Sequence, residues 1–146
     1  MNAQGRHLHI SERILIAYRQ LKGYYRGAGG SGQLSPTEVG VLEILGALGE
    51  ATPSEMARTL RAARSSMTHA LDRLERRRLV RRVRERQDRR SVSIVLTRRG
   101  RGMANRVHAA LQGLDVRVKG ALTAIEYQAL LRALHTVEEA AREGWT

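Results

Sequence analysis

The sequence contains no cysteine, and this absence removes several kinds of chemistry at once. Without thiols the chain has no cysteine nucleophile, no cysteine-ligated zinc, no iron–sulfur cluster and no thiol-based redox sensor. It also carries no disulfide evidence for secretion. The N-terminus lacks the basic and then apolar pattern of a signal peptide, and no run of eighteen apolar residues occurs. We therefore expect a cytoplasmic protein without a membrane partner.

Aromatic residues are also few: the chain has four tyrosines, one tryptophan and no phenylalanine. This scarcity argues against a platform on which single-stranded bases stack. The length of 146 residues is that of one ordinary domain, which can bury a core without disulfides.

Positive charge is abundant, and it is concentrated in one segment. Residues 58–101 contain 16 arginines and 4 acids, a net charge of +12, whereas the rest of the chain holds 10 basic and 10 acidic residues. A solvated basic surface is the ordinary explanation of a high charge. Its confinement to 44 residues instead favours a polyanionic partner.

The hydrophobic periodicity predicts helices and one hairpin. Three capping boxes, Ser35–Glu38, Thr52–Glu55 and Thr123–Glu126, mark helix starts, and Thr97 is a further N-cap candidate. After residue 78 the period changes to two, with Val92, Ile94 and Leu96 alternating against Ser91, Ser93 and Val95. The expected helices begin near residues 10, 36, 53, 64, 98 and 124, and the expected strands are 79–84 and 91–96.

This order predicts a mainly α fold with a small two- or three-stranded β-wing. Two short helices followed by an amphipathic basic one are typical of a helix-turn-helix, and the hairpin makes it winged. Three further amphipathic helices flank this unit, and their apolar stripes must be buried, which indicates N- and C-terminal dimerisation helices. The expected divisions are 1–33 for the first dimerisation helix and its linker, 34–99 for the DNA-binding domain and 100–146 for the remaining dimerisation helices.

The helix that begins at Arg64 has the layout that the major groove of DNA requires. A helix entering that groove presents short polar side chains at its N-terminal end and positive charge along its flanks. Its apolar face would hold Met67, Ala70, Leu71 and Leu74. The opposite face carries the candidate DNA contacts Arg64, Ser65, Ser66, Thr68, His69, Arg73 and Arg76.

The hairpin tip carries the other candidate DNA contacts, Arg86, Asp88, Arg89 and Arg90. A hairpin tip beside DNA lies near the narrow minor groove, where an inserted arginine is favoured. Asp88 is unexpected there because phosphates repel it. It either orients an arginine through a charge-assisted pair or simply forms the turn.

The stretch from about Leu34 to Arg106 resembles the MarR family of bacterial transcription regulators. The family's D-R-R wing motif is matched by Asp88-Arg89-Arg90, and its L-T-x-x-G motif by the segment 96–100. The segments LSPTEVGVLEIL, TPSEMARTL and LDRLERRRLV resemble its two leading helices and the end of its recognition helix. The resemblance implies that Arg90 enters the minor groove with Asp88 as its orienting partner.

The same resemblance implies a homodimer, a pseudo-palindromic double-stranded operator and repression of transcription. One position departs from the family's pattern, because Arg78 stands where members usually have glycine, at a site suited to a left-handed helix cap. Arg78 would either adopt that strained conformation or end the helix differently.

Many relatives release DNA when a small anionic or phenolic effector binds between the dimerisation and DNA-binding parts. By resemblance alone, the candidate lining residues here are Tyr18, Arg19, Tyr24, Tyr25, Met56 and His69. Ordinary packing is the competing explanation for all six. No cofactor and no metal site are expected.

Three other functions compete with this one. Ser65 or Ser66 with His69 and Asp72 has the residue types of a hydrolytic triad, but on one helix these side chains diverge, so we do not expect an enzyme. A non-specific architectural DNA-binding protein would use the same basic surface and remains the main alternative. A protein-interaction winged helix would be expected to lack the wing arginines.

Overall fold

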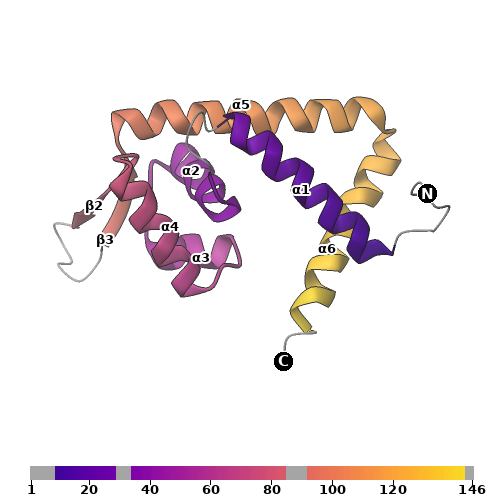
Figure 1. The fold of residues 1–146 in the computed structure, drawn as a ribbon, viewed down its shortest axis with the longest axis horizontal. Coiled ribbons are helices and arrows are strands. Elements are labelled where there is room, and N and C mark those ends of the chain that lie inside the picture. The colour runs from indigo at the N-terminus through magenta and orange to yellow at the C-terminus, as the bar shows by residue number, and fades with distance from the viewer. Residues whose placement is uncertain (1–8, 29–33, 85–91, 144–146) are drawn as a thin grey trace. The chain divides into compact units, whose positions relative to one another are not determined.

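The computed structural model describes residues 9–28, 34–84 and 92–143 (Figure 1). In these residues the order of elements is α1 (Ile10–Ala28), α2 (Pro36–Leu48), β1 (Glu50–Ala51), α3 (Pro53–Thr59), α4 (Arg64–Arg76), β2 (Val80–Arg84), β3 (Val92–Leu96), α5 (Arg98–Ala121) and α6 (Ala124–Glu143). The mainly helical winged fold expected from the sequence is confirmed, and most boundaries agree within one or two residues.

The predicted capping boxes form at all three helix starts. At α2 the Ser35 hydroxyl accepts a hydrogen bond from the Glu38 amide at 3.2 Å, and the Glu38 carboxylate accepts one from the Ser35 amide at 2.6 Å. The same reciprocal bonds start α3 and α6. Each box gives partners to amides that the helix itself leaves unpaired, so these boundaries are set locally.

The hairpin belongs to a three-stranded antiparallel sheet in the order β1-β3-β2. Val80 pairs with Leu96 and Arg84 with Val92, while the two-residue strand β1 pairs with the other edge of β3. The expected alternation along β3 is wrong at one position, because Ser93 is buried. Burial of this small polar side chain departs from the strict inside–outside alternation of a sheet with one solvated face.

The hydrophobic core lies among α2, α3, α4, the sheet and the start of α5. It includes fully buried side chains such as Leu42, Met56, Leu71 and Ile94. Among the described residues, α1 and α6 contribute no fully buried hydrophobic side chain. The winged unit therefore supplies its own core.

The chain divides into two compact units, residues 1–110 and 111–146. In the second unit Asp115 accepts a hydrogen bond from the Tyr127 hydroxyl at 2.7 Å and pairs with Lys119 at 2.7 Å. The hydrogen bond from Lys119, and then the one from Tyr127, lowers the pKa of Asp115. The predicted divisions after residues 33 and 99 stay predictions.

A joint at Thr97 connects the end of β3 to the turn after α4. The Thr97 hydroxyl lies 2.7 Å from the Arg78 carbonyl oxygen, to which it donates, and it accepts a hydrogen bond from the Gly100 amide at 2.9 Å. The Thr97 amide donates to the Leu79 carbonyl at 3.0 Å. A Cβ on Gly100 would lie only 1.8 Å from that carbonyl oxygen. This close approach explains the glycine of the L-T-x-x-G motif.

The turn after α4 is a Schellman motif built on a non-glycine residue. Arg78 has φ +56°, its amide donates to the Glu75 carbonyl at 2.8 Å, and the Leu79 amide donates to the Leu74 carbonyl at 2.9 Å. Leu74 and Leu79 are both fully buried, as the motif's hydrophobic contact requires. Arg78 thus adopts the left-handed conformation in which glycine is the usual residue.

Gly100→Ala tests the joint. The added methyl group would collide with the Leu79 carbonyl, so we expect the free energy of unfolding to fall by about 2 kcal/mol or more, measured by urea denaturation at one fixed protein concentration. Gly102→Ala is the matched control, because a Cβ there meets nothing within 4 Å. In a helix this control should raise stability by up to about 1 kcal/mol. Equal effects of the two substitutions would contradict the account of the joint.

Arg78→Gly tests the strained cap. Glycine adopts the left-handed conformation without the steric penalty that a Cβ brings, so the substitution should raise the free energy of unfolding by about 1 kcal/mol in the same urea assay. Arg78→Ala removes the same charge but keeps the Cβ, so it should bring no such gain. If alanine stabilises the protein as much as glycine does, charge repulsion and not backbone strain is the cost at this position.

Candidate nucleic-acid interface

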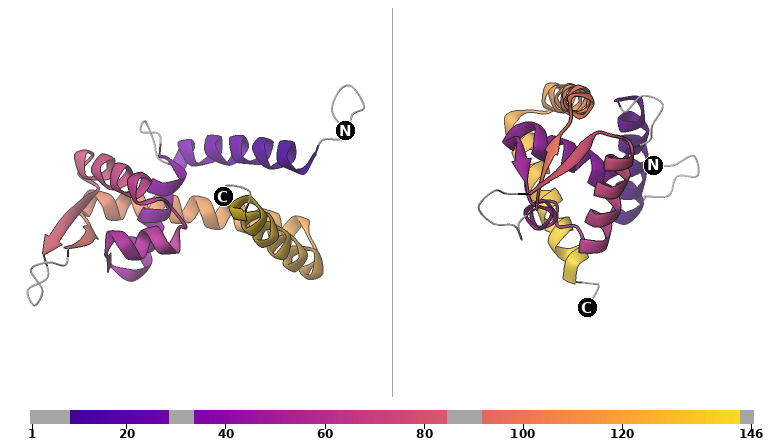
Figure 2. Two further views of the ribbon diagram at one scale, coloured as in Figure 1. Left: turned by 90° about the horizontal axis from the view of Figure 1, so that it is seen from below. Right: turned by 90° about the vertical axis from the view of Figure 1, so that its left-hand side faces the viewer.

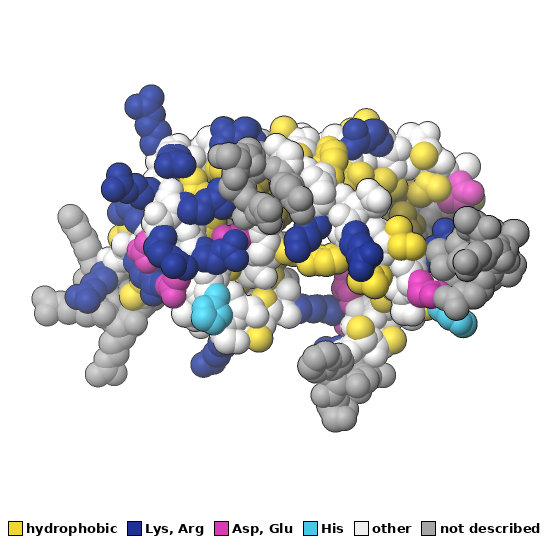
Figure 3. Space-filling model, in the orientation of Figure 1, with side chains coloured by type: hydrophobic (Ala, Val, Ile, Leu, Met, Phe, Trp, Pro, Cys, Tyr) yellow, Lys and Arg dark blue, Asp and Glu magenta, His cyan; other side chains and the backbone are white. Residues whose placement is uncertain are grey.

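The polar face of α4 is exposed as the sequence predicted. The buried face consists of Met67, Ala70, Leu71 and Leu74. The predicted contacts on the other face are all exposed: Arg64, Ser65, Ser66, Thr68, His69, Arg73 and Arg76. The helix therefore presents short polar groups at its start and arginines further along. In Figure 3 dark-blue basic side chains gather on the left of the molecule, over α4 and the hairpin.

The backbone amides at the start of α4 have no side-chain cap and can donate hydrogen bonds to an external acceptor. Its N-cap, Ala63, provides no side-chain hydrogen bond. The first-turn amides of a helix have no partners within it and attract anions such as phosphate. A hollow of about 420 Å³ between α3 and α4 is lined by Arg58, Arg61 and Arg64. The sequence pattern singles out Arg64 but neither Arg58 nor Arg61, whose clustering depends on the turn between the helices.

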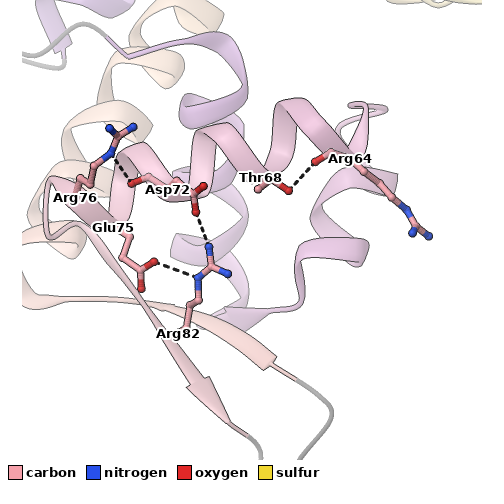
Figure 4. A network of polar contacts seen from close by, with 6 residues as sticks. All are labelled: Arg64, Thr68, Asp72, Glu75, Arg76 and Arg82. Carbon is pink, nitrogen blue, oxygen red and sulfur yellow. Dashed lines mark hydrogen bonds and ion pairs between the residues drawn. The ribbon is translucent and has the colours of Figure 1, made fainter.

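Some of the polar groups on α4 are already engaged within the protein. The Thr68 hydroxyl donates to the Arg64 carbonyl at 3.0 Å, and Arg76 Nε donates to the Asp72 carbonyl at 3.3 Å (Figure 4). Both are local bonds to the preceding turn of the same helix. They leave the remaining guanidinium donors of Arg76 facing outward.

Arg73 connects the recognition helix to α2. Its guanidinium lies 3.3 Å from Glu38 Oε2, and the Glu38 side chain is completely buried while that of Arg73 is half exposed. Glu38 Oε1 has no hydrogen-bond partner among the described residues. The sequence pattern assigns Glu38 only to the capping box. The fold gives its carboxylate a second contact, with an arginine 35 positions along the chain.

Arg82 of β2 connects the hairpin to α4. Its NH2 group lies 2.7 Å from Asp72 Oδ1, and its Nε lies 3.1 Å from Glu75 Oε2 (Figure 4). Sequence reasoning missed this contact. One available signal was that only four acids occur among the sixteen arginines of residues 58–101, and two of these acids stand three residues apart on the recognition helix.

The wing candidates Arg86, Asp88, Arg89 and Arg90 lie outside the described residues. The strands that lead to them are described, and in the left-hand view of Figure 2 they extend beyond helices α2–α4. The roles assigned to these four residues stay predictions.

The effector candidates face different surroundings. Met56 is fully buried in the core, whereas His69 is exposed on α4 and Tyr18 is exposed on α1. Tyr24 donates its hydroxyl to the Ala110 carbonyl at 2.8 Å and stacks edge-to-face on Tyr25 at 6.1 Å.

Tyr24 also lines an open hollow of about 580 Å³ together with Arg106. Burial, and then the neighbouring Tyr24, raises the pKa of Tyr25. Arg19, the sixth candidate, is exposed on α1. Within the described part of the chain, no three His, Asp or Glu side chains are placed to hold a metal ion, and no helix is long and apolar enough to cross a membrane.

Comparison with known proteins decides the family. The model of the MarR family matches residues 34–92, the segment that contains α2, α3, α4 and β2. This helix-turn-helix segment is of the MarR type. Members of this family are DNA-binding transcription regulators and not enzymes.

Solved structures agree with this assignment. The repressor CouR bound to a 23-mer DNA duplex is 28% identical, with a TM-score of 0.71, over 89% of this chain and 92% of that one. FabT of Streptococcus pneumoniae in complex with DNA is 22% identical, with a TM-score of 0.72, over 92% and 96% of the two chains. A cysteine-to-serine mutant of MarR from E. coli complexed with operator DNA is 23% identical, with a TM-score of 0.70, over 88% and 92%. No curated protein sequence is significantly similar to this chain.

Arg73→Ala tests the contact with α2. The substitution leaves the buried Glu38 carboxylate without its counter-charge, so we expect a loss of about 2 kcal/mol in the free energy of unfolding, less than for a fully buried pair because Arg73 is half exposed. Arg76→Ala, one turn further along the same face, should change stability by less than about 0.5 kcal/mol. Adding Glu38→Gln to Arg73→Ala should recover part of the loss, since glutamine keeps the cap and carries no charge. A loss no larger than that of Arg76→Ala would contradict the pairing.

Proposed function

We propose that this MarR-family regulator is a sequence-specific repressor that binds a pseudo-palindromic operator as a homodimer in the cytoplasm. The observation that carries the proposal is the exposed face of α4, on which short polar side chains precede arginines. Base edges in the major groove are read by side chains of this kind, while phosphates are contacted by the flanking arginines. The DNA complexes of CouR and FabT support the proposal because both have the same fold.

The dimer is supported by apolar surface on the outer helices. On one face of α1, Ile10, Ile14 and Tyr18 are 67%, 37% and 45% exposed. On one face of α6, Leu130, Leu131 and Leu134 are 37%, 44% and 47% exposed. Apolar faces of this extent on two helices indicate burial against another chain. A two-fold dimer would present two recognition helices about one DNA turn, ~34 Å, apart.

The wing would add a minor-groove contact through Arg90, with Asp88 as its orienting partner. This part of the proposal rests on the sequence motif and on the family resemblance. An arginine on a loop loses side-chain entropy of up to about 2 kcal/mol when it is ordered, and a charge-assisted pair with an aspartate would reduce that loss on DNA binding.

Release of DNA by a small anionic or phenolic effector is a further part of the proposal. The hollow beside Tyr24 supports it, because an apolar wall with one arginine, Arg106, matches an aromatic anion. The hollow lies between α1 and α5 within the first unit. Movement of these helices would therefore be transmitted to the winged domain.

The test of the function is a binding titration against the DNA that flanks the protein's own gene and against a random duplex of equal length, at 50 and 200 mM salt. A sequence-specific regulator keeps an affinity gap between the two duplexes at the higher salt, because base contacts release no counter-ions. Equal affinities that fall together with salt would support the architectural alternative instead.

Two wing variants test the minor-groove role. Arg90→Ala should weaken operator binding about tenfold or more and reduce the slope of log affinity against log salt, since one phosphate-neutralising charge is lost. Asp88→Ala should also weaken binding although it removes a negative charge. If Asp88→Ala binds more tightly, the aspartate is only a turn-former; if Arg90→Ala binds as the wild type does, the minor-groove contact is refuted.

A further inference from the structure

The guanidinium of Arg82 joins the hairpin to two acids of the recognition helix. Its NH2 group reaches Asp72 on α4 at 2.7 Å, and its Nε reaches Glu75 at 3.1 Å. The two acids are three residues apart and so lie on one face of the helix. Figure 4 shows the arginine rising from β2 and placed between both carboxylates. A planar fork of donors can span two acceptors in this way, whereas an ammonium group is a point charge.

The contribution of this contact to the free energy of unfolding is too small to be its main role. The side chains of Arg82, Asp72 and Glu75 are 44%, 48% and 42% exposed. Ion pairs so exposed contribute between zero and about 1 kcal/mol each. The geometry of the contact, and not its strength, is therefore its distinguishing property.

Without Arg82, the two acids would oppose DNA binding because of where their charges lie. They lie on the helix that faces DNA in the proposed function, in a segment otherwise filled with arginine. Free carboxylates there would repel phosphates and could accept hydrogen bonds from cytosine amino groups. With Arg82 in place, an oxygen of each carboxylate is occupied and half of their combined charge is neutralised.

The position of Arg82 also determines how firmly the hairpin is held. The base of the hairpin is fixed by the Thr97–Leu79 hydrogen bond. Arg82 lies three residues further along β2, about 10 Å from that base at the usual rise of a strand. Strand β1 also holds β3 at Ile94 and Val95, on the edge away from β2. Arg82 adds an attachment on the β2 side, and so fixes the angle between this edge of the hairpin and α4.

We propose that Arg82 is a positioning residue for DNA recognition. By holding Asp72 and Glu75 it sets the angle between the hairpin β2–β3 and the recognition helix α4, and it keeps both carboxylates from opposing the DNA. The inference rests on the proposed DNA-binding function for its consequence, but the mechanical part concerns the free protein and is testable without DNA.

The first experiment measures amide hydrogen exchange of the DNA-free protein. Arg82→Ala should raise the exchange rates of the β2 and β3 amides by about tenfold, a loss of about 1.4 kcal/mol in local opening free energy. The amides of α2 should not change. Arg84→Ala is the matched control, since it removes the same charge from the same face of β2, and Arg84 has no carboxylate partner in the described part of the structure. Exchange in Arg82→Ala no faster than in Arg84→Ala would overturn the proposal.

The second experiment measures operator affinity and the salt slope for a set of variants. The double variant Asp72→Asn/Glu75→Gln should bind DNA several-fold more weakly although two negative charges are gone, and adding Arg82→Ala to it should cost little more. Arg82→Lys keeps the charge but not the fork, so it should restore less than half of the loss, in logarithmic terms, caused by Arg82→Ala. Tighter binding by the double variant, or full rescue by lysine, would show that Arg82 is an ordinary phosphate contact.

The two experiments separate failure of this inference from failure of the function. If the wild-type protein shows no preference for any operator over random DNA, the function fails while the exchange experiment still decides the role of Arg82. Thermal unfolding of each variant should stay within a few degrees of the wild type, because the substituted side chains are exposed. A global loss of structure in the Arg82 variants would contradict a purely positional role.

Discussion

The close contact between the backbone of Gly100 and the carbonyl of Leu79 fixes the geometry on which the DNA-facing surface depends. The contact permits Thr97 to close the sheet against the turn that ends α4. The recognition helix, the hairpin and the long helix α5 are therefore connected at one joint. Any side chain larger than hydrogen at residue 100 would push these three elements apart. The recognition helix α4 and the hairpin β2–β3 would then point in different directions.

From this joint, three arginine contacts determine how charge is presented to DNA. Arg73 ties the recognition helix to the buried Glu38 of α2, and Arg82 ties the hairpin to the same helix. Arg78 supports the turn between them at a conformational cost. In a segment with a net charge of +12, the two acids that the structure describes, Asp72 and Glu75, share one arginine as their partner. Fixing some arginines in this way leaves the others for the phosphate contacts of the proposed function.

Local features of the sequence predicted most of the fold, because capping boxes and helical periodicity act within a few residues. Ser35–Glu38 and Thr123–Glu126 form as expected, and Arg78 adopts one of the two conformations considered for it. A three-stranded wing was one of the two alternatives, but the position of its third strand, β1 at Glu50–Ala51, and the burial of Ser93 were not foreseen. Both depend on how elements from different parts of the sequence pack together.

The polar face of α4 was likewise readable from periodicity. The partners of Glu38 and Arg82 were not, because they pair residues from different elements and depend on the angles at which those elements pack. The wing tip is assigned by motif alone.

The most direct test of sequence-specific recognition by a two-fold dimer is selection of bound duplexes from a random-sequence DNA pool by the purified full-length protein at 200 mM salt. The account predicts enrichment of a pseudo-palindrome whose half-sites are centred about one helical turn, ~10 base pairs, apart. A pool that stays random after repeated rounds, with binding that depends only on duplex length and salt, would contradict it.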